Sequence, residues 1–467
     1  MQPDVLGETV IATMRDTDVA GKRISVIGAA RSGVAVAQLL NERGALVFVS
    51  DSAPAEKLQS QISNLQSQRI QFEVGVHSDR VCDTDLLVLS PGVPSNVRVV
   101  RDAELRGIRI VSELEVASWF CPAPIVAVTG TNGKTTTTTL IGRMLHDGKK
   151  RHIVAGNIGT AFSSVVGTLD ENSVAVLEVS SFQLDHIQSF HPKISIILNI
   201  TPDHLDRYEQ EFAKYIASKS RIFENQTKDD FLIYNHDDVE TRQRVGQLSS
   251  PHVHTLPFGV DKQFEEGAFV EGGRLTTILS GKRVDVVEVK EISIKGIHNL
   301  YNAMASMLVA RILGVSVPSI RATLRNFKGV EHRLEFVREL NGVKYVNDSK
   351  ATNVDSVWYA LQAFEEPIVL LLGGRDKGND YAKLSALVER HVRAIVAIGE
   401  SADKVVRSFP GLKNVVRANS MEEAVQLASR IGSPGDVVLL SPACASFDWF
   451  ENYEQRGNVF KQIVNTL

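Results

Sequence analysis

The residues best suited to chemistry form a glycine-rich loop between an apolar run and a helix-like stretch. The loop reads Thr-Gly-Thr-Asn-Gly-Lys-Thr over residues 129–135. It is shorter than the usual P-loop, G-x-x-x-x-G-K-[ST], because Val128 occupies the position of the first glycine. Backbone N–H groups and a helix N-terminus would converge on phosphate, Lys134 would neutralise its charge, and the Thr135 hydroxyl would reach Mg²⁺. An ordinary turn is the alternative. The predicted phosphate site comprises Thr129, Gly130, Thr131, Asn132, Gly133, Lys134, Thr135 and Thr136.

Acidic residues and a histidine follow two apolar runs downstream of this loop. Glu178 ends the run 174–177, and Asp203-His204-Leu205-Asp206 follows the run 194–198. Carboxylates at strand ends beside a phosphate loop commonly hold Mg²⁺, directly or through water. We predict metal-site roles for Glu178 and His204, whereas Asp203 and Asp206 could equally cap the following helix. On spacing alone, Lys219 is typical of a surface helix lysine.

The N-terminal segment partly matches a dinucleotide-binding fingerprint. Gly28 to Gly33 follows an apolar run, but Ala30 stands where the fingerprint G-x-G-x-x-G requires its middle glycine. A methyl group there obstructs the approach of a pyrophosphate. Asp51, at the end of the next apolar run, is well placed for a ribose hydroxyl. The pattern favours a nucleotide site over a purely structural turn, and makes NAD chemistry the least favoured of the three.

Polar clusters follow three apolar runs in the last third of the chain. These clusters span residues 347–353, 373–377 and 441–446. Each alone is an ordinary loop, but at one end of a parallel sheet they would form a rim for an anionic ligand. Upstream, Asn299 and Asn302 lie on one face of a predicted helix, where they could contact a purine or serve core or capping roles.

Alternating apolar runs and helix-like stretches predict a parallel α/β architecture. A length of 467 residues suggests about three domains. The proline-rich segment 121–124 and the restart of the pattern near Gly329 mark the boundaries. We predict domains over residues 1–112, 113–329 and 330–467, with a β-rich flank over 255–295.

Composition excludes several classes of protein. A net charge of -4 without any Lys/Arg block argues against a nucleic-acid binder. Cys82, Cys121 and Cys444 are too widely separated for a disulfide framework or a zinc site, which favours a reducing compartment. The sequence carries neither a signal-peptide pattern nor an apolar run of membrane-spanning length. We expect a cytoplasmic protein without membrane association.

Together these motifs closely resemble the Mur ligase family, the ATP-dependent amide-forming enzymes of peptidoglycan precursor synthesis. The resemblance covers essentially the whole chain and includes residues 129–135, 156–159, 178, 203–204, 298–299 and 331–333. Residues 347–353 and 440–446 resemble the branch that adds D-glutamate to UDP-N-acetylmuramoyl-L-alanine, and the D-N-P-R-type segment of the diamino-acid branch is missing. The resemblance implies a monomeric α/β protein with a Rossmann-like N-terminal domain, a central P-loop ATPase-type domain and a Rossmann-like C-terminal domain.

The resemblance also implies roles for individual residues. Contacts to the UDP-substrate fall on Arg31, Ser32, Asp51, Ser90, Gly92 and Asn157. ATP contacts beyond the loop fall on Asn299, Asn302, Arg333, Asp348 and Lys350. D-Glutamate would meet His204, Thr352, Lys377, Ser446 and Tyr453. Two Mg²⁺ sites would use Thr135, Glu178, His204 and a carbamylated Lys219, and the catalytic set would be Lys134, Glu178, His204 and Lys219.

Two positions depart from the family pattern. Tyr453 stands where relatives often carry Phe, so its hydroxyl has no assigned role, and Ala53 replaces a polar or basic UDP contact. The implied reaction proceeds through an acyl phosphate, which the amine of D-glutamate attacks. Rival interpretations are a folylpolyglutamate synthase, which would start near the phosphate loop, a non-catalytic nucleotide-binding protein, and a nicotinamide oxidoreductase.

Overall fold

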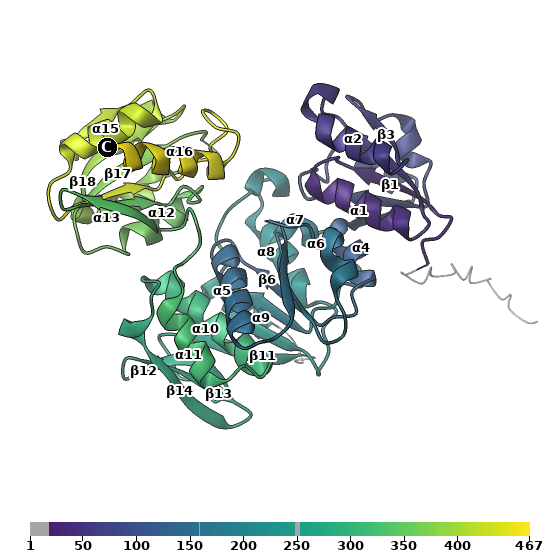
Figure 1. Ribbon diagram of the computed structural model, residues 1–467, viewed down its shortest axis with the longest axis horizontal. Helices are drawn as coiled ribbons and strands as arrows, with labels where there is room; N and C mark the ends of the chain where they lie inside the picture. The colour runs from purple at the N-terminus through teal and green to yellow at the C-terminus, as the bar shows by residue number, and fades with distance from the viewer. Residues whose placement is uncertain (1–17, 158, 248–252, 377) are drawn as a thin grey trace, which may run out of the picture.

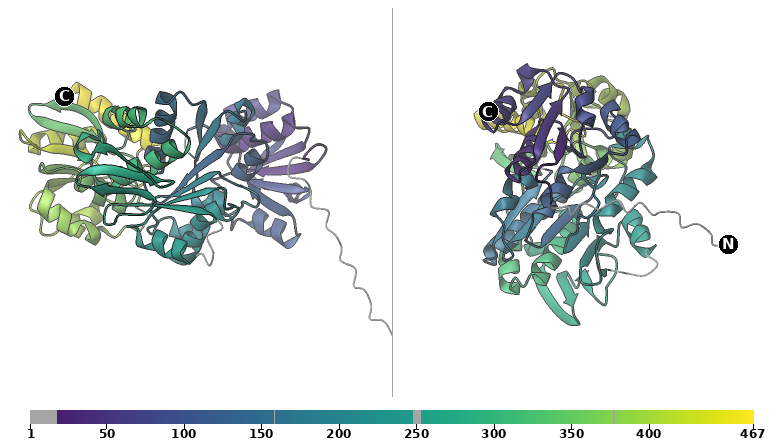
Figure 2. Two further views of the ribbon diagram at one scale, coloured as in Figure 1. Left: turned by 90° about the horizontal axis from the view of Figure 1, so that it is seen from below. Right: turned by 90° about the vertical axis from the view of Figure 1, so that its right-hand side faces the viewer.

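The computed structural model describes residues 18–157, 159–247, 253–376 and 378–467. Three α/β units, each built on its own sheet, follow one another along the chain. The N-terminal and C-terminal units lie at opposite ends of the molecule with the central unit between them (Figures 1 and 2). The predicted α/β fold with three units is therefore confirmed.

The N-terminal unit is a five-stranded parallel sheet with the order β3-β2-β1-β4-β5. Its strands are β1 (Arg23–Ile27), β2 (Leu46–Asp51), β3 (Gln71–Val74), β4 (Leu86–Leu89) and β5 (Arg109–Ser112). Its helices are α1 (Arg31–Glu42), α2 (Gln59–Ser67) and α3 (Arg98–Leu105), and α4 (Glu113–Trp119) leads from β5 into the central unit. The strand order reverses between β1 and β4, and ligands of open α/β sheets bind at the carboxyl ends of such strands.

The central unit is a nine-stranded sheet with the order β14-β13-β12-β11-β10-β9-β6-β8-β7. Its strands are β6 (Ile125–Thr129), β7 (His152–Gly156), β8 (Val174–Glu178), β9 (Ile194–Ile197), β10 (Phe231–Asn235), β11 (His254–Gly259), β12 (Gly267–Glu271), β13 (Arg274–Leu279) and β14 (Lys282–Glu288). Its helices are α5 (Lys134–Asp147), α6 (Phe162–Val165), α7 (Ser181–Leu184), α8 (Phe212–Ser220), α9 (Val239–Gly246), α10 (Ile297–Ile312) and α11 (Val317–Asn326). The predicted β-rich flank is confirmed as β11–β14, which extends this sheet.

The C-terminal unit is a six-stranded sheet with the order β15-β16-β20-β17-β18-β19, in which β15 alone runs antiparallel to its neighbour. Its strands are β15 (Glu335–Leu340), β16 (Val343–Asn347), β17 (Ile368–Gly373), β18 (Val392–Ile398), β19 (Val415–Arg417) and β20 (Val437–Leu440). Its helices are α12 (Val354–Leu361), α13 (Ser385–His391), α14 (Ala402–Ser408), α15 (Met421–Ile431) and α16 (Tyr453–Thr466). The carboxyl ends of β16, β17 and β20 bring residues 347–353, 373–376 and 441–446 of the three predicted polar clusters to one edge.

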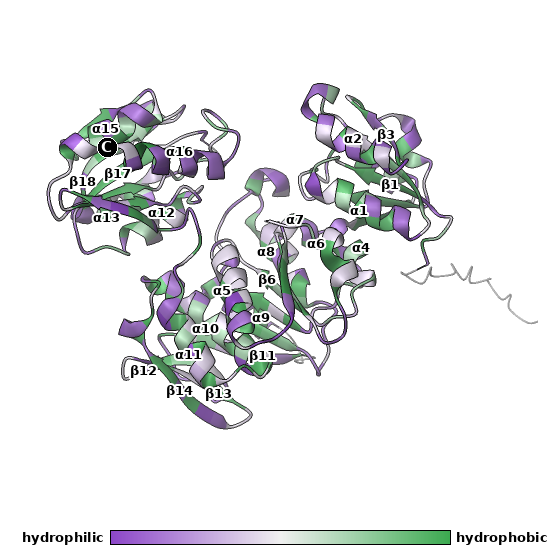
Figure 3. Cartoon of the chain, viewed as in Figure 1, coloured by the Kyte–Doolittle hydropathy of each residue, from purple (hydrophilic) through white to green (hydrophobic). Residues whose placement is uncertain are grey.

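Burial explains why the central strands form. Every residue of β6, β8 and β17 is buried, as expected for parallel strands covered by helices on both faces. Figure 3 shows hydrophobic residues concentrated on the strands of the sheets and hydrophilic residues on the surrounding helices and loops. The sequence pattern did not predict several strands. Those at the edges of sheets are β3, β5, β7, β15 and β19. Among the described residues, no helix has the length and apolarity needed to cross a membrane.

Candidate active site

The glycine-rich loop joins β6 to α5 and is held in shape before any ligand binds. Gly133 caps α5 in the left-handed conformation with φ +87°, and a Cβ there would stand 2.4 Å from Asn302 Oδ1. The Asn199 side chain brackets the loop, because its Oδ1 accepts from Asn132 N at 2.9 Å and its Nδ2 donates to Asn132 O at 3.1 Å. Such a preformed cradle fits an anionic phosphate.

Two lysines, the partly buried Lys134 and the buried Lys219, converge on one carbonyl of this loop. Lys134 Nζ donates to Gly130 O at 2.8 Å and to Thr131 O at 2.9 Å, and Lys219 Nζ donates to the same Gly130 O at 2.9 Å. Burial lowers the pKa of both amines, and the neighbouring Lys134 lowers that of Lys219 further. Burial therefore favours the neutral form of the Lys219 amine more than exposure to solvent would.

Glu178 has the features expected of a cation ligand. Its Oε2 accepts from Thr135 Oγ1 at 2.7 Å, while its Oε1 has no hydrogen-bond partner among the described residues. The residue is only 2% exposed. An unpaired buried carboxylate oxygen costs free energy, so it calls for a partner that the protein itself does not supply. Lys350 Nζ also donates to Thr135 Oγ1, at 2.7 Å.

His204 has a left-handed backbone conformation with φ 52° and directly precedes the short 3-10 helix η4 (Leu205–Tyr208). Its ring packs edge-on against Phe182 at 6.1 Å between centroids, and its Nε2 lies 3.8 Å from Asp203 Oδ2. The alternative that Asp203 or Asp206 caps the following helix is wrong. His204 occupies the N-cap of η4 without a side-chain cap, and Glu211 occupies that of α8.

A cavity of about 450 Å³ opens beside the loop. It gathers seven residues that the sequence predicted for ATP, namely Asn132, Gly133, Thr136, Asn299, Asn302, Arg333 and Asp348. Arg333 Nε and His298 Nδ1 are buried there without partners among the residues described. Burial lowers the pKa of His298 to about 4, and Arg333 adds to this effect. A neutral imidazole, amides and a guanidinium suit a nucleotide with its phosphates.

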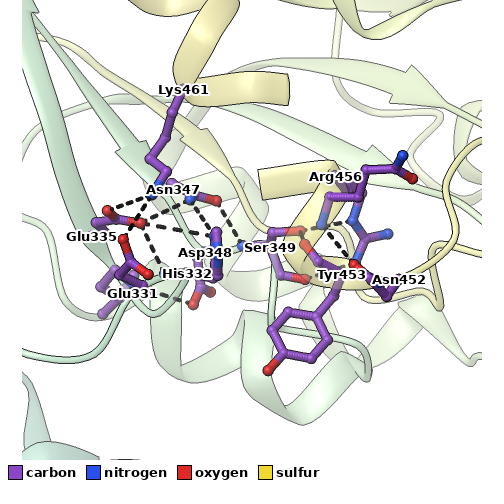
Figure 4. Close-up of polar contacts among 12 residues, drawn as sticks. Glu331, His332, Glu335, Asn347, Asp348, Ser349, Asn452, Tyr453, Arg456 and Lys461 are labelled. Atoms are coloured by element: carbon purple, nitrogen blue, oxygen red, sulfur yellow. Dashed lines mark hydrogen bonds and ion pairs between the residues drawn. The ribbon is translucent and has the colours of Figure 1, made fainter. Parts of the chain in front are cut away.

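Asp348 is a buried residue of the cavity lining, where it accepts from Leu334 N at 3.2 Å and from Ser441 Oγ at 2.8 Å. Burial raises its pKa to about 7. The adjacent Ser349 is fixed by Arg456, whose Nε donates to Ser349 Oγ at 2.9 Å (Figure 4). The same guanidinium donates to Cys444 O at 3.0 Å, which joins the 347–353 cluster to the 441–446 cluster.

Of the residues predicted for D-glutamate, Thr352, Ser446 and Tyr453 belong to the C-terminal unit, whereas His204 belongs to the central unit. Ser446 is buried, Thr352 is partly buried, and the Tyr453 ring lies 5.2 Å from Lys350 Nζ. Tyr453 O accepts from Ser349 Oγ at 2.8 Å, as Figure 4 shows. The predicted contact at Lys377 lies outside the described residues.

The residues predicted for the UDP-substrate gather mainly at the carboxyl edge of the N-terminal sheet. Ser90 Oγ donates to Gly28 O at 2.9 Å, and Arg31 and Ser32 open α1. Both oxygens of Asp51 accept backbone N–H groups, from Ala29 at 2.6 Å and Ala53 at 2.7 Å, so this carboxylate also shapes the turn. Asn157 lies in the central unit instead, where its N donates to Glu178 O at 2.9 Å.

Sequence reasoning missed two contacts between the C-terminal unit and the phosphate loop region. Ser356 Oγ donates to Asn132 Oδ1 at 3.0 Å, and Asn353 Nδ2 donates to Asp203 Oδ2 at 3.2 Å. Ser356 and Asn132 are 224 residues apart, and no local pattern signals such a pairing. The only available signal was the polar character of the 347–353 cluster.

Three models of known domain families match three successive segments of the chain, which correspond to the three units. The Mur ligase middle domain matches residues 128–310, the glutamate ligase domain of Mur ligases matches 332–444, and the Mur ligase MurD-like N-terminal domain matches 22–112. A protein of Chloroherpeton thalassium named UDP-N-acetylmuramoylalanine--D-glutamate ligase is 47% identical over 97% of this chain and 100% of its own length. A protein of the same name from Salinibacter ruber is 46% identical, over 97% and 100%.

A solved structure shares the fold. The UDP-N-acetylmuramate-alanine ligase of Thermotoga maritima superposes with a TM-score of 0.60 at 21% identity, covering 95% of this chain and 99% of that one. The three matched domains together cover most of the chain, and the curated relatives match it from end to end. On these grounds the chain belongs to the Mur ligase family.

Proposed function

We propose that this protein joins D-glutamate to UDP-N-acetylmuramoyl-L-alanine through an amide bond, at the expense of ATP, in peptidoglycan precursor synthesis. Mur ligases are ATP-dependent, and relatives named for this reaction are 41–47% identical over 96–97% of the chain. The observation that carries the proposal is the convergence of Lys134, Glu178 and Lys219 on the phosphate loop. That arrangement suits transfer of the γ-phosphoryl group of ATP to a carboxylate.

In the proposed reaction, an oxygen of the alanyl carboxylate attacks the γ-phosphorus, and ADP leaves. The amine nitrogen of D-glutamate then attacks the acyl phosphate carbon, loses a proton, and phosphate leaves. Lys134 would hold the phosphoryl oxygens, since its amine lies within the loop. Arg333, in the segment before β15, and Lys350, in the C-terminal unit, would supply further positive charge. The buried site would exclude water, which otherwise hydrolyses an acyl phosphate.

Two Mg²⁺ sites belong to the proposal. Thr135, Glu178 and His204 would hold the ions, and the unpaired Glu178 Oε1 is the feature that supports this role. Bound Mg²⁺ would neutralise phosphate charge. Lys219 would join them as a carbamate, because a buried neutral amine can add CO₂ and become a carboxylate-like ligand.

We assign the UDP-substrate to Arg31, Ser32, Asp51, Ser90, Gly92 and Asn157, and D-glutamate to His204, Thr352, Lys377, Ser446 and Tyr453. The proposed domain limits are 1–112, 113–329 and 330–467; β5 ends at Ser112 and β15 begins at Glu335, which supports them. We further propose a cytoplasmic monomer. Three free thiols at Cys82, Cys121 and Cys444 suit a reducing compartment, and light scattering would test the monomer.

The decisive test is phosphate release from ATP by the purified protein with Mg²⁺, UDP-N-acetylmuramoyl-L-alanine and a panel of D- and L-amino acids. We expect release that depends on D-glutamate, with a product heavier by one glutamyl residue. Release with another amino acid would assign the protein to a different branch of the family. ATP binding without release would favour the non-catalytic alternative. A folate ligase is disfavoured by the N-terminal domain match at 22–112.

A further inference from the structure

His204 and the short helix η4 that follows it contribute residues to three different parts of the active site. His204 precedes it at the proposed metal site, Arg207 contacts the N-terminal unit, and Tyr208 packs against Tyr215 of α8, the helix of Lys219. Non-glycine residues in the left-handed conformation bound it, with φ 52° at His204 and 54° at Glu209. Such conformations persist only where the surroundings fix them. η4 is therefore a fixed part of the central unit.

Arg207 connects this fixed helix to a loop of the N-terminal unit. Its guanidinium donates to Pro91 O at 3.3 Å and to Gly92 O at 3.1 Å. The same group lies 4.5 Å from the centroid of the Phe182 ring. Phe182 in turn contacts the His204 ring, so one continuous series of contacts runs from His204 to Gly92.

The 90–92 loop keeps its shape within its own unit without Arg207. Ser90 N donates to Ile27 O at 3.0 Å, Ser90 Oγ donates to Gly28 O at 2.9 Å, and Val93 N donates to Ser90 O at 3.0 Å. Gly92 is exposed, so its carbonyl would be hydrated if Arg207 were removed. Arg207 therefore influences where the loop stands relative to the central unit more than how it folds.

We propose that Arg207 is a positioning residue, which holds the UDP-substrate loop at a fixed distance from the phosphate-transfer centre. The inference rests on the proposed function, in which Ser90 and Gly92 contact the UDP-substrate. With the loop fixed, the alanyl carboxylate of that substrate reaches the γ-phosphate held near Lys134. Two carbonyl acceptors side by side suit the planar fork of arginine, and a lysine ammonium cannot reproduce both bonds together with the ring contact.

The test compares Arg207→Ala and Arg207→Lys with the unmodified protein and with a control, Arg98→Ala. Arg98 is an exposed arginine on α3 of the same unit as the 90–92 loop. Steady-state kinetics give kcat and KM for each substrate, and titration calorimetry gives the Kd for UDP alone. We expect kcat/KM for UDP-N-acetylmuramoyl-L-alanine to fall about 10- to 100-fold in both Arg207 variants, because misplacing a reacting group lowers the rate by about this factor.

In the same variants the Kd for UDP and the KM for ATP should stay within about twofold, and thermal unfolding should be unchanged. A loss of UDP affinity as large as the fall in kcat/KM would overturn the inference, because it would show that Arg207 binds UDP directly. Normal turnover in Arg207→Ala would also overturn it while leaving the proposed function intact. No D-glutamate-dependent turnover in the unmodified protein would contradict the proposed function and this inference with it.

Discussion

Lys219 shows how burial changes the chemistry of a side chain. It is 1% exposed, lies 2.9 Å from Gly130 O and 4.7 Å from the Tyr215 ring centroid, and its pKa lies well below the ordinary value of lysine. The neutral amine can attack CO₂, forming an N–C bond and releasing a proton. We predict that removing dissolved CO₂ lowers activity and that bicarbonate restores it. Lys219→Ala should lose about 100-fold or more in kcat and respond to short carboxylic acids instead.

The matched control for this prediction is Lys214→Ala. Lys214 lies on the same helix but is exposed, with ion pairs to Glu209 and Glu211. Its removal should leave both the rate and its dependence on CO₂ unchanged. Activity close to that of the unmodified protein in Lys219→Ala would contradict the carbamate role.

Asp348 is predicted to make stability depend on pH. Its folded-state pKa is raised to about 7, against about 3.9 for an unperturbed Asp. Between about pH 4 and pH 7 the folded chain keeps a proton that the unfolded chain has released, so stability falls as pH rises through this window. Asp348→Asn removes this effect. It should stabilise the protein by roughly 1 to 3 kcal/mol at pH 8 and by little at pH 4.

Urea unfolding of the Asp348→Asn variant and of the unmodified protein across this pH range measures the difference. Asp403→Asn, which changes an exposed carboxylate paired with Arg417, serves as the control. If the stability difference between the Asp348→Asn variant and the unmodified protein does not change with pH, the carboxyl group does not titrate in this window.

At the scale of elements, Gly33 sets how closely α1 approaches the sheet. A Cβ there would stand 1.8 Å from Gly28 O and 2.5 Å from Ser90 Oγ. Because the first atom is backbone, Gly33→Ala must separate α1 from the turn after β1. We expect a loss of about 2–4 kcal/mol of stability and weaker UDP binding. Binding of an ATP analogue should persist, since the phosphate loop lies in another unit.

Calorimetric melting and titration with each nucleotide check this prediction. Gly246→Ala is the control, because a Cβ at the end of α9 would meet nothing within 4 Å. Loss of ATP-analogue binding in Gly33→Ala would mean that the N-terminal and central units do not respond separately.

Local patterns explain which elements and residues were predictable. Buried strands such as β6 and β17 are continuous apolar runs, and the phosphate loop, Glu178 and His204 stand at or just beyond the ends of such runs. The edge strands β3 and β19 contain no fully buried residue, so their sequences lack that pattern. Lys219 looked like a surface lysine until family resemblance gave it a role.

The individual contacts between units could not be predicted from local sequence. Arg207 reaches Pro91 across 116 residues, and Ser356 reaches Asn132 across 224. Such pairs depend on how three separately folded sheets dock, and nothing in the local sequence of either partner encodes the distance. The architecture could be derived from strand and helix periodicity, whereas the assembled site required the docked units.

At the scale of the whole molecule, three cations from different segments meet at one site. Lys134 comes from the phosphate loop, Arg333 from the segment before β15, and Lys350 from the C-terminal unit. Burial lowers the pKa of Lys350 to about 7, and the charges of Arg333 and Lys134 contribute to the shift. Without phosphate these groups repel one another, so the C-terminal unit should sample positions farther from the loop. The phosphates of ATP would remove that repulsion and favour the contacts at Thr135 and Asn132.

Small-angle scattering tests this closure. An ATP analogue with Mg²⁺ should reduce the radius of gyration of the protein, and the UDP-substrate alone should do so less, because none of the residues assigned to it is one of the three cations. Lys350→Gln should contract less on binding the analogue, since it removes one of the attracted charges. Added salt screens repulsion between charges, so it should also reduce the radius of the ligand-free protein. Identical radii with and without the analogue would mean that the C-terminal unit is already seated, and the repulsion among Lys134, Arg333 and Lys350 would then have to be offset within the folded chain.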